Sequence, residues 1–536
     1  MKCYKDFIRQ ETNVKRTLAC ILSFCSLYSC SYMEHVSIQA EYARIQEADP
    51  GQVNLKHMLD RETFFLIGQT LDVQNRYADL PLAVAAYSSK FKLNERVDTM
   101  FLTRAGSHFG LNLPEGDYQL LVFADRNNNQ LFEPAEVVSQ QALSLNQATF
   151  PDKVVDRIEL PLESPREVTW AQEIQQPESP ELRQSLFFPT GTLRSLDDPL
   201  FSDNMAILGM YDPASFLEKA PTTFYALEED FDYKIPVIFV HGVGGSTRNF
   251  AEIVNRLDRN RYKPWFFYYP SGGDLDQLAE TFHRIFLSGK VIGQKKGPMI
   301  IVAHSMGGLV VREALNKYEN RPDENKVALF VSIASPFGGH PAAASGEKHG
   351  LIVLPSWRDV NPENSFIKQL FRKPLPKTTE HQLLYAFDNP ATLKLSKNSD
   401  GVVPLASQLR MEAQQQATGQ LGFESSHTGI LENDAMIDYL FARMDQVEGF
   451  YPEPHLEMLR RGGYDIKLSD NYTPLGQYVI HSLGKYWMAV TRGELKPCFP
   501  EQERFLRVVN GEEPPKYQVV KDWLRFLEEY PEIGRN

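Results

Sequence analysis

The stretch Ile-Val-Ala-His-Ser-Met-Gly-Gly at 301–308 constrains the fold more than any other part of the chain. An apolar run of the kind that forms a buried strand ends there in a small-x-Ser-x-Gly turn that opens a helix. A serine at such a sharp turn projects its hydroxyl away from the sheet, beside the free amides of the helix N-terminus. Ser305 is therefore the predicted nucleophile. The alternative is an ordinary buried turn serine.

Two further regions supply residue types that such a serine needs. Upstream, 235–240 has the pattern of a buried strand and runs into His-Gly-Val-Gly-Gly at 241–245, a glycine-rich loop whose amides can face a substrate. Downstream, Ser-Asp-Gly-Val-Val at 399–403 supplies an acid, and Ser-His-Thr-Gly at 426–429 supplies a base. The chain order is thus nucleophile, acid, histidine.

The chemistry assigns a role to each of these residues. A serine hydroxyl is a poor nucleophile at neutral pH, so a histidine must accept its proton and a carboxylate must orient that histidine. His427 and Asp400 are predicted to do so. The amides of Val243 and Met306 are predicted to form the oxyanion hole. Asp388, which follows the apolar run 383–387, is the alternative acid, although the Asp-Gly turn at 400 followed by two valines fits better.

These motifs resemble those of the α/β-hydrolase lipases and esterases, and most closely those of the small Bacillus-type lipases, which share alanine at the position of Ala303. The resemblance covers about residues 230–445 and implies a doubly wound, mostly parallel sheet over 231–449. It also implies that Ser305, Asp400 and His427 form a catalytic triad. No cofactor and no metal are expected, and no metal-ligand spacing of the His-Glu-x-x-His kind is found in the sequence.

The chain departs from that family in an apolar insertion over 337–380, where this fold commonly carries a cap over its pocket. The segments 351–357 and 366–371 are its apolar parts. A cap lined in this way suits acyl chains. An equally good interpretation is that these residues pack the insertion onto the body of the domain.

The N-terminus has the architecture of an export signal. Five basic residues within the first sixteen precede an apolar run at 18–28, which is short for a membrane span. The sequence Leu-Tyr-Ser-Cys at 27–30 resembles a bacterial lipobox, and this implies a signal peptide at 1–29, lipidation of Cys30 and a tether over 30–59. A plain signal peptide is the alternative. We expect a lipid-anchored protein of the bacterial cell envelope, on the periplasmic or surface face of the outer membrane.

Charge and cysteine content limit the partners. The net charge is −13, and loss of residues 1–29, which carry five basic and two acidic side chains, would leave −16. So acidic a chain repels nucleic acid and anionic headgroups, hence no nucleic-acid partner is expected. Only Cys30 and Cys498 would remain after cleavage, and lipidation of Cys30 would preclude an intramolecular disulfide. Protein partners cannot be deduced.

Three regions flank the predicted catalytic domain. Short apolar runs at 64–67, 82–87, 101–103 and 118–124, set between turn residues, predict a β-sandwich over 60–165. The segment 106–118 and the apolar run after it resemble carboxypeptidase-regulatory-like domains. Residues 166–230 are expected to be a linker that becomes an ordered wrap. Helical apolar spacing at 475–491, 500–509 and 517–530, with Gly493 and Gly511 as stops, predicts a helical region over 450–536.

One loop of the β region has the spacing of a calcium site. Asp125, Asn127, Asn129 and Glu136, with Glu133 between them, offer oxygen atoms at EF-hand-like positions. Gln130 stands where such a loop needs glycine. We therefore favour an Asx-rich turn that satisfies its own backbone.

The sequence as a whole predicts a serine hydrolase that cleaves carboxylic esters, lipid esters in particular, through an acyl-Ser305 intermediate. The substrate would be a lipid or a small ester, and the membrane would be reached through the lipid anchor. An envelope acyltransferase with the same triad is one alternative. A non-enzymatic envelope adaptor is the other.

Overall fold

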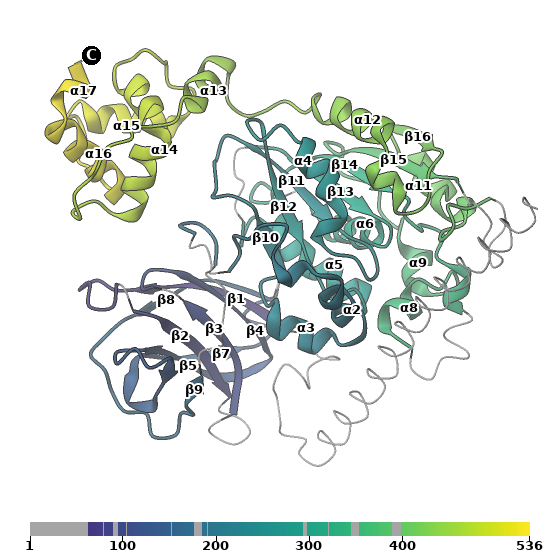
Figure 1. Ribbon diagram of the computed structural model, residues 1–536, viewed down its shortest axis with the longest axis horizontal. Helices are drawn as coiled ribbons and strands as arrows, with labels where there is room; N and C mark the ends of the chain where they lie inside the picture. The colour runs from purple at the N-terminus through teal and green to yellow at the C-terminus, as the bar shows by residue number, and fades with distance from the viewer. Residues whose placement is uncertain are drawn as a thin grey trace, which may run out of the picture.

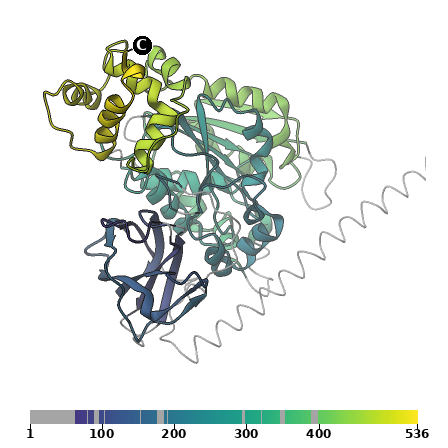
Figure 2. The same cartoon turned by 60° about the vertical axis from the view of Figure 1, so that its left-hand side comes forward.

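The computed structural model describes residues 63–535, except 79, 89–94, 103, 152, 176–184, 190, 293–296, 320, 345–352 and 389–397 (Figure 1). The expected signal peptide, the tether and Cys30 lie outside the described residues. In Figure 2 the β-rich N-terminal part, drawn in purple, lies below the hydrolase-like centre, and the C-terminal helices, drawn in yellow, lie above it.

A seven-stranded sheet organises the centre of the molecule (Figure 1). Its order is β10-β12-β11-β13-β14-β15-β16, and all neighbours are parallel except β10, which runs antiparallel to β12. The bounds are β10 Phe224–Ala226, β11 Ile235–Val240, β12 Tyr262–Phe267, β13 Met299–His304, β14 Val327–Ile333, β15 Glu380–Ala386 and β16 Gly419–Phe423. The strands β11, β12 and β13 are buried throughout, as parallel strands covered on both faces must be.

Helices cover both faces of this sheet. One face packs against α5 (Leu275–Phe282), the π-helical turn η5 (His283–Leu287) and α6 (Gly307–Lys317). The other face packs against α4 (Ala251–Arg256) and α12 (Asp434–Met444). The short helices α10 (Leu405–Gln408) and α11 (Met411–Gln416) connect β15 to β16. The predicted doubly wound, mostly parallel sheet is confirmed.

The segment before β11 belongs to this domain more fully than expected. The helices α2 (Asp203–Tyr211) and α3 (Pro213–Lys219) follow a short turn, η3 (Pro199–Phe201). Phe201 and Phe216 are completely buried in the same apolar cluster as α4 and α12. Because β10 is the edge strand of the sheet, the domain begins at or before 224 and not at 231. The three residues of β10 are too few for their pattern to reveal a strand.

The apolar insertion contributes α8 (Pro355–Asp359) and α9 (Ser365–Gln369). Ile367 and Leu370 are buried in the cluster that holds α5 and α6. For these residues the structure shows packing onto the body of the domain. Residues 345–352 lie outside the described part, so an acyl-binding role for the rest of the insertion stays a prediction.

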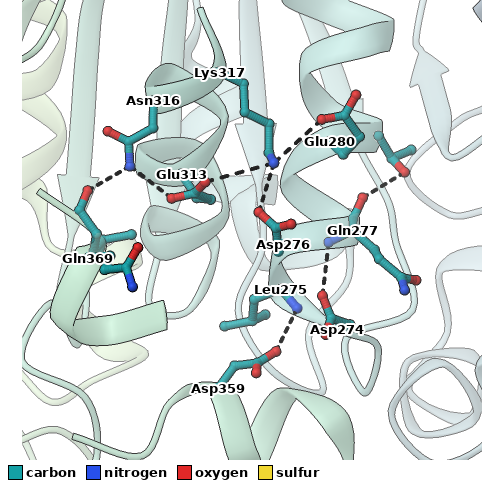
Figure 3. Close-up of polar contacts among 12 residues, drawn as sticks. Asp274, Leu275, Asp276, Gln277, Glu280, Glu313, Asn316, Lys317, Asp359 and Gln369 are labelled. Carbon is teal, nitrogen blue, oxygen red and sulfur yellow. Dashed lines mark hydrogen bonds and ion pairs between the residues drawn. The ribbon is translucent and has the colours of Figure 1, made fainter. Parts of the chain in front are cut away.

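Charged groups join α5 to α6 and the insertion to both helices (Figure 3). The Lys317 ammonium on α6 lies 2.7 Å from Asp276 and 3.5 Å from Glu280 on α5. Arg372 of the insertion pairs with Glu313 on α6 at 2.5 Å. The carboxylate of Asp359, at the end of α8, accepts a hydrogen bond of 2.9 Å from the Leu275 amide (Figure 3). The insertion therefore satisfies a free amide at the N-terminus of α5.

Two packed sheets form the N-terminal β unit, with orders β4-β1-β8 and β3-β2-β5-β7. The bounds are β1 Thr63–Leu71, β2 Leu82–Ser88, β3 Glu95–Leu102, β4 His108–Pro114, β5 Gly116–Ala124, β7 Val137–Leu145 and β8 Val154–Pro161. Three predicted runs coincide with β1, β2 and β5, and the run 101–103 lies at the end of β3. Their inward side chains form one apolar core, as in a sandwich.

The β unit extends past its predicted end at 165. A short antiparallel pair is formed by β6 (Leu131–Phe132) and β9 (Ile174–Gln175). Val168, Ala171 and Ile174 are buried in a cluster with Phe132 and Val137. The expected linker therefore begins after 175, because these apolar residues cover the outer face of the four-stranded sheet.

The oxygens of the Asp125 loop bind the loop's own backbone. Asp125 accepts from the amides of Asn129 (3.1 Å) and Gln130 (2.9 Å), and Asn129 accepts from that of Leu131. Glu136 accepts from the Arg126 amide. Asn127 donates to Glu133. An Asx-rich turn that satisfies its own backbone, the interpretation favoured from the sequence, makes contacts of this kind.

The C-terminal region is helical, as α13 (Glu453–Arg460), α14 (Pro474–Thr491), α15 (Pro500–Val509), α16 (Gln518–Glu529) and α17 (Pro531–Arg535). Gly493 and Gly511 have φ values of 72° and 77° just after α14 and α15, the left-handed conformation that ends helices. The Tyr478 hydroxyl donates to the Asp230 carbonyl and so ties α14 to the hydrolase domain. Among the described residues, no helix combines the length and apolarity that crossing a bilayer requires.

The Asp359 contact predicts a pH-dependent stability. Burial raises the pKa of Asp359 to about 6, so the protonated form is favoured by folding and stability is lost as pH rises through that value. Asp359→Asn keeps an acceptor for the Leu275 amide without a charge. At pH 8 its thermal midpoint should equal or exceed that of the wild type, and its advantage should shrink towards pH 4.

Asp359→Ala is the matched comparison, because it removes both the charge and the acceptor and should be about 1 kcal/mol less stable than Asp359→Asn. Thermal melts of the three proteins from pH 4 to pH 8 decide the matter. Equal losses in Asp359→Asn and Asp359→Ala at pH 8 would contradict the assigned role of this carboxylate.

Candidate active site

Ser305 lies at the turn between β13 and α6, in a backbone conformation that few residues adopt. Its φ is 54°, although it is not glycine. Strain of this kind costs about 1–3 kcal/mol and persists only where surrounding contacts hold it. The Ser305 amide donates to the Ile333 carbonyl at the end of β14 (2.8 Å), which fixes the turn against the neighbouring strand.

Two glycines allow the surrounding backbone to approach this serine. A Cβ atom added at Gly242 would lie 2.7 Å from the Ser305 Cβ. One added at Gly307 would lie 2.4 Å from the Val240 carbonyl oxygen. Both separations are shorter than real Cβ contacts allow. The small residues of the two motifs are therefore required by the close contact between the 241–245 loop and the turn at 305.

The structure brings Ser305, His427 and Asp400 into one chain of hydrogen bonds. The His427 Nε2 lies 2.9 Å from the Ser305 Oγ, and its Nδ1 lies 2.6 Å from the Asp400 Oδ2. All three are buried, with 5%, 7% and 1% of their surface exposed. Their sequence separations are 122 and 27 residues, so the sheet topology assembles them.

Both carboxylate oxygens of Asp400 accept further hydrogen bonds. Its Oδ1 accepts from the amides of Val402 (2.9 Å) and Val403 (2.6 Å). The Gln408 amide donates to its Oδ2 at 3.1 Å. The alternative acid, Asp388, is exposed at the surface, and its backbone amide donates to the Ser425 carbonyl. The position next to His427 therefore belongs to Asp400.

Sequence reasoning missed Gln408. This side chain is fully buried at the end of α10, and its amide also bonds both backbone groups of Ala386 at the end of β15. Gln408 thus connects the loop that carries Asp400 to the end of β15. Nothing in the sequence around 408 marks it, because its role depends on the loop folding back across β15.

Two other buried histidines, His304 and His241, lie near the three hydrogen-bonded residues. The His304 Nε2 lies 2.8 Å from the His427 carbonyl oxygen, so this nitrogen carries the proton. Burial lowers the pKa of His304 to about 3 and that of His241 to about 4. His241 stacks on Tyr269 with ring centroids 4.3 Å apart. Both stay neutral at pH 7 and support the loops without titrating.

The predicted oxyanion amides belong to two segments that meet at the serine. Met306 follows Ser305 directly and is the N-cap of α6, and Val243 follows Gly242, whose Cα borders the Ser305 side chain. Within the described part of the chain, neither amide donates to a backbone or side-chain acceptor. Two amides in this state can receive a developing oxyanion.

The described residues contain no group of three or more His, Cys, Asp or Glu side chains that could hold a metal ion. The remaining histidines of the centre have other partners. His381 bonds Ser332 and stacks on Phe330, and His340 lies 2.7 Å from the Val402 carbonyl oxygen.

A mostly parallel sheet with a strained serine after one strand, an acid after a later strand and a histidine after the last defines an α/β-hydrolase. The sequence pattern of the lecithin:cholesterol acyltransferase family matches residues 278–401, which include this serine and this acid. The chain therefore has the α/β-hydrolase fold, and over residues 278–401 it is similar to that acyltransferase family.

Solved structures similar to the chain include a gene product of Listeria innocua (16% identity, TM-score 0.30, covering 40% of this chain and 95% of that one). Bacillus licheniformis lipase BlEst2 is similar at 18% identity (TM-score 0.32, 41% and 97% covered). Legionella pneumophila phospholipase PlaB is similar at 18% identity (TM-score 0.28, 33% and 44% covered). Among curated proteins, no sequence matches the chain.

Proposed function

We propose that the protein hydrolyses carboxylic esters of lipids through an acyl-Ser305 intermediate. The observation that carries the proposal is the continuous chain of hydrogen bonds from Asp400 through His427 to Ser305. In this arrangement a carboxylate orients the imidazole and stabilises its charged form, and the imidazole accepts the hydroxyl proton.

The first half of the reaction forms the acyl-enzyme. The Ser305 Oγ attacks the ester carbonyl carbon while the His427 Nε2 takes the hydroxyl proton. The Val243 and Met306 amides receive the negative oxygen of the tetrahedral intermediate. As the intermediate collapses, His427 returns the proton to the departing alcohol oxygen, and the acyl group remains on Ser305.

The second half restores the enzyme. Water attacks the acyl carbonyl carbon, and His427 takes one of its protons. Collapse of the second tetrahedral intermediate breaks the bond to Ser305, whose Oγ recovers the proton from His427. The products are a carboxylic acid and an alcohol, and the histidine has acted as base and then acid in each half.

Apolar residues around the triad favour lipid esters. Val243 and Val402 are 43% and 45% exposed. Val243 follows Gly242, which borders the Ser305 side chain, and the Val402 amide donates to Asp400. Exposed apolar side chains grouped at a reaction centre suit a hydrocarbon substrate. The match to a family named for an acyltransferase of lecithin supports the same class.

Acyl transfer to an alcohol is the second candidate, and the family match favours it specifically. An acceptor alcohol would take the place of water in the second half of the reaction, with the same residues in the same roles. Product analysis with a competing long-chain alcohol separates the two reactions.

Kinetics of single and double variants test the triad. Ser305→Ala and His427→Ala should each lower ester hydrolysis by about 10⁴-fold or more, and the double variant should be hardly worse than either. Asp400→Asn should also be severe, because it disfavours the tautomer that His427 needs. Asp388→Asn is the matched control and should change kcat by less than about twofold.

Additive losses in the double variant would contradict a shared role. So would a loss in Asp388→Asn that equals the loss in Asp400→Asn.

We further propose that the protein is a lipoprotein of the bacterial envelope, anchored through acyl chains on Cys30. The support is the basic start, the short apolar run and the Leu-Tyr-Ser-Cys sequence that ends at 30. Because one acyl chain binds a membrane only marginally, stable anchoring requires two or more.

Metabolic labelling with a fatty-acid probe tests the anchor. The wild type should be labelled, and Cys30→Ala should not be. Cys498→Ala, which removes the other cysteine of the mature chain, should be labelled like the wild type. Equal labelling of Cys30→Ala, or a mature N-terminus at another residue, would refute the anchor.

A further inference from the structure

The C-terminal helices enclose a cavity of about 420 Å³ that has no part in the chemistry at Ser305. It lies between α14, α15 and the first turn of α16, and Asp232 and Tyr233 line it from the hydrolase domain. These two residues precede β11, whereas the 241–245 loop follows it. Because a six-residue strand spans about 20 Å, the cavity and the triad lie at opposite ends of the sheet.

Most of the cavity surface is apolar. Fourteen of its nineteen lining residues are aliphatic or aromatic. Leu483, Trp487 and Phe505 are only half-buried, and Tyr517 is 57% exposed. Trp487 and Phe505 contact each other edge to face at 4.8 Å. The volume is within the range of about 300–1,000 Å³ usual for small-molecule sites, and this lining suits a hydrocarbon.

Four charged residues contribute to the lining, two of them acidic and two basic. Glu501 and Arg504 lie one turn apart on α15, and Lys516 immediately precedes the exposed Tyr517. Asp232 and Glu501 are the acidic residues of the lining, and Arg504 and Lys516 are the basic ones.

Lys516 is the cation available to a ligand. Within the described residues it has no ion pair, while Arg504 already lies 3.4 Å from Glu513. An apolar cavity lined by a cation that forms no ion pair is complementary to a single hydrocarbon chain that ends in a negative group.

We propose that this cavity is a second, non-catalytic lipid site that binds one fatty carboxylate. The hydrocarbon chain lies against Trp487 and Phe505, and the carboxylate pairs with Lys516. The ligand class follows from the cavity alone and does not depend on the reaction proposed at Ser305.

Quenching of tryptophan fluorescence by a brominated sixteen-carbon fatty acid tests the site. The full chain is first blocked at Ser305 with an organophosphonate, so that binding at the triad does not contribute. Quenching should be saturable, and unbrominated fatty acids should compete. Each added methylene should tighten binding about fourfold until the cavity is filled. The fatty alcohol of equal length should bind about tenfold more weakly than the acid.

Three variants localise the ligand. Lys516→Gln should weaken binding of the acid about tenfold and leave binding of the alcohol unchanged. Lys521→Gln, an exposed change on α16 outside the lining, should change neither. Trp487→Phe should remove most of the quenching, and Trp170→Phe in the β unit should keep it.

Other occupants give other results, and each would overturn the proposal. Absence of saturable quenching, or equal affinity for acid and alcohol, excludes a carboxylate site. Quenching that appears only after removal of residues 1–62 would mean that this segment fills the cavity. Concentration-dependent dimers that exclude the fatty acid would mean that a second copy does.

Discussion

The strained turn at Ser305 is the constraint on which the rest of the catalytic domain depends. The neighbouring strands and α6 hold this positive φ at a non-glycine residue, through the bond from the Ser305 amide to Ile333 on β14 and through the close approach of Gly307 on α6 to Val240 on β11. The same turn places the hydroxyl at the carboxyl edge of the sheet. His427, Asp400 and the two predicted oxyanion amides are arranged around this hydroxyl.

The site is assembled by parallel strands whose carboxyl ends share one edge. Loops after β11, β13, β15 and β16 supply in turn the Val243 amide, the serine, the acid and the histidine. A second layer keeps these loops in place, with Gln408 holding Asp400 and His304 holding the backbone of His427. Because His304 is buried and neutral, it orients the loop without adding a charge beside the imidazole.

Local patterns predict those parts of the structure that depend on neighbouring residues alone. The apolar run 235–240 coincides with β11, and the strand-to-helix turn predicted at Ser305 lies between β13 and α6. Gly493 and Gly511 end their helices as expected. Three features that depend on tertiary contacts were not predicted from the sequence. They are the three-residue strand β10, the packing of Val168 and Ile174 on the β unit, and the role of Gln408. None of these has a periodic signal, since each is stabilised by a partner distant in sequence.

The central claim is that Ser305 is the nucleophile, and covalent trapping tests it most directly. An organophosphonate ester mimics the tetrahedral intermediate once it is attached to the attacking oxygen. Intact mass spectrometry followed by peptide mapping should find one adduct, on Ser305, with parallel loss of ester hydrolysis and much slower labelling in His427→Ala. An adduct on a different serine, or full labelling of Ser305→Ala with loss of activity, would contradict the account.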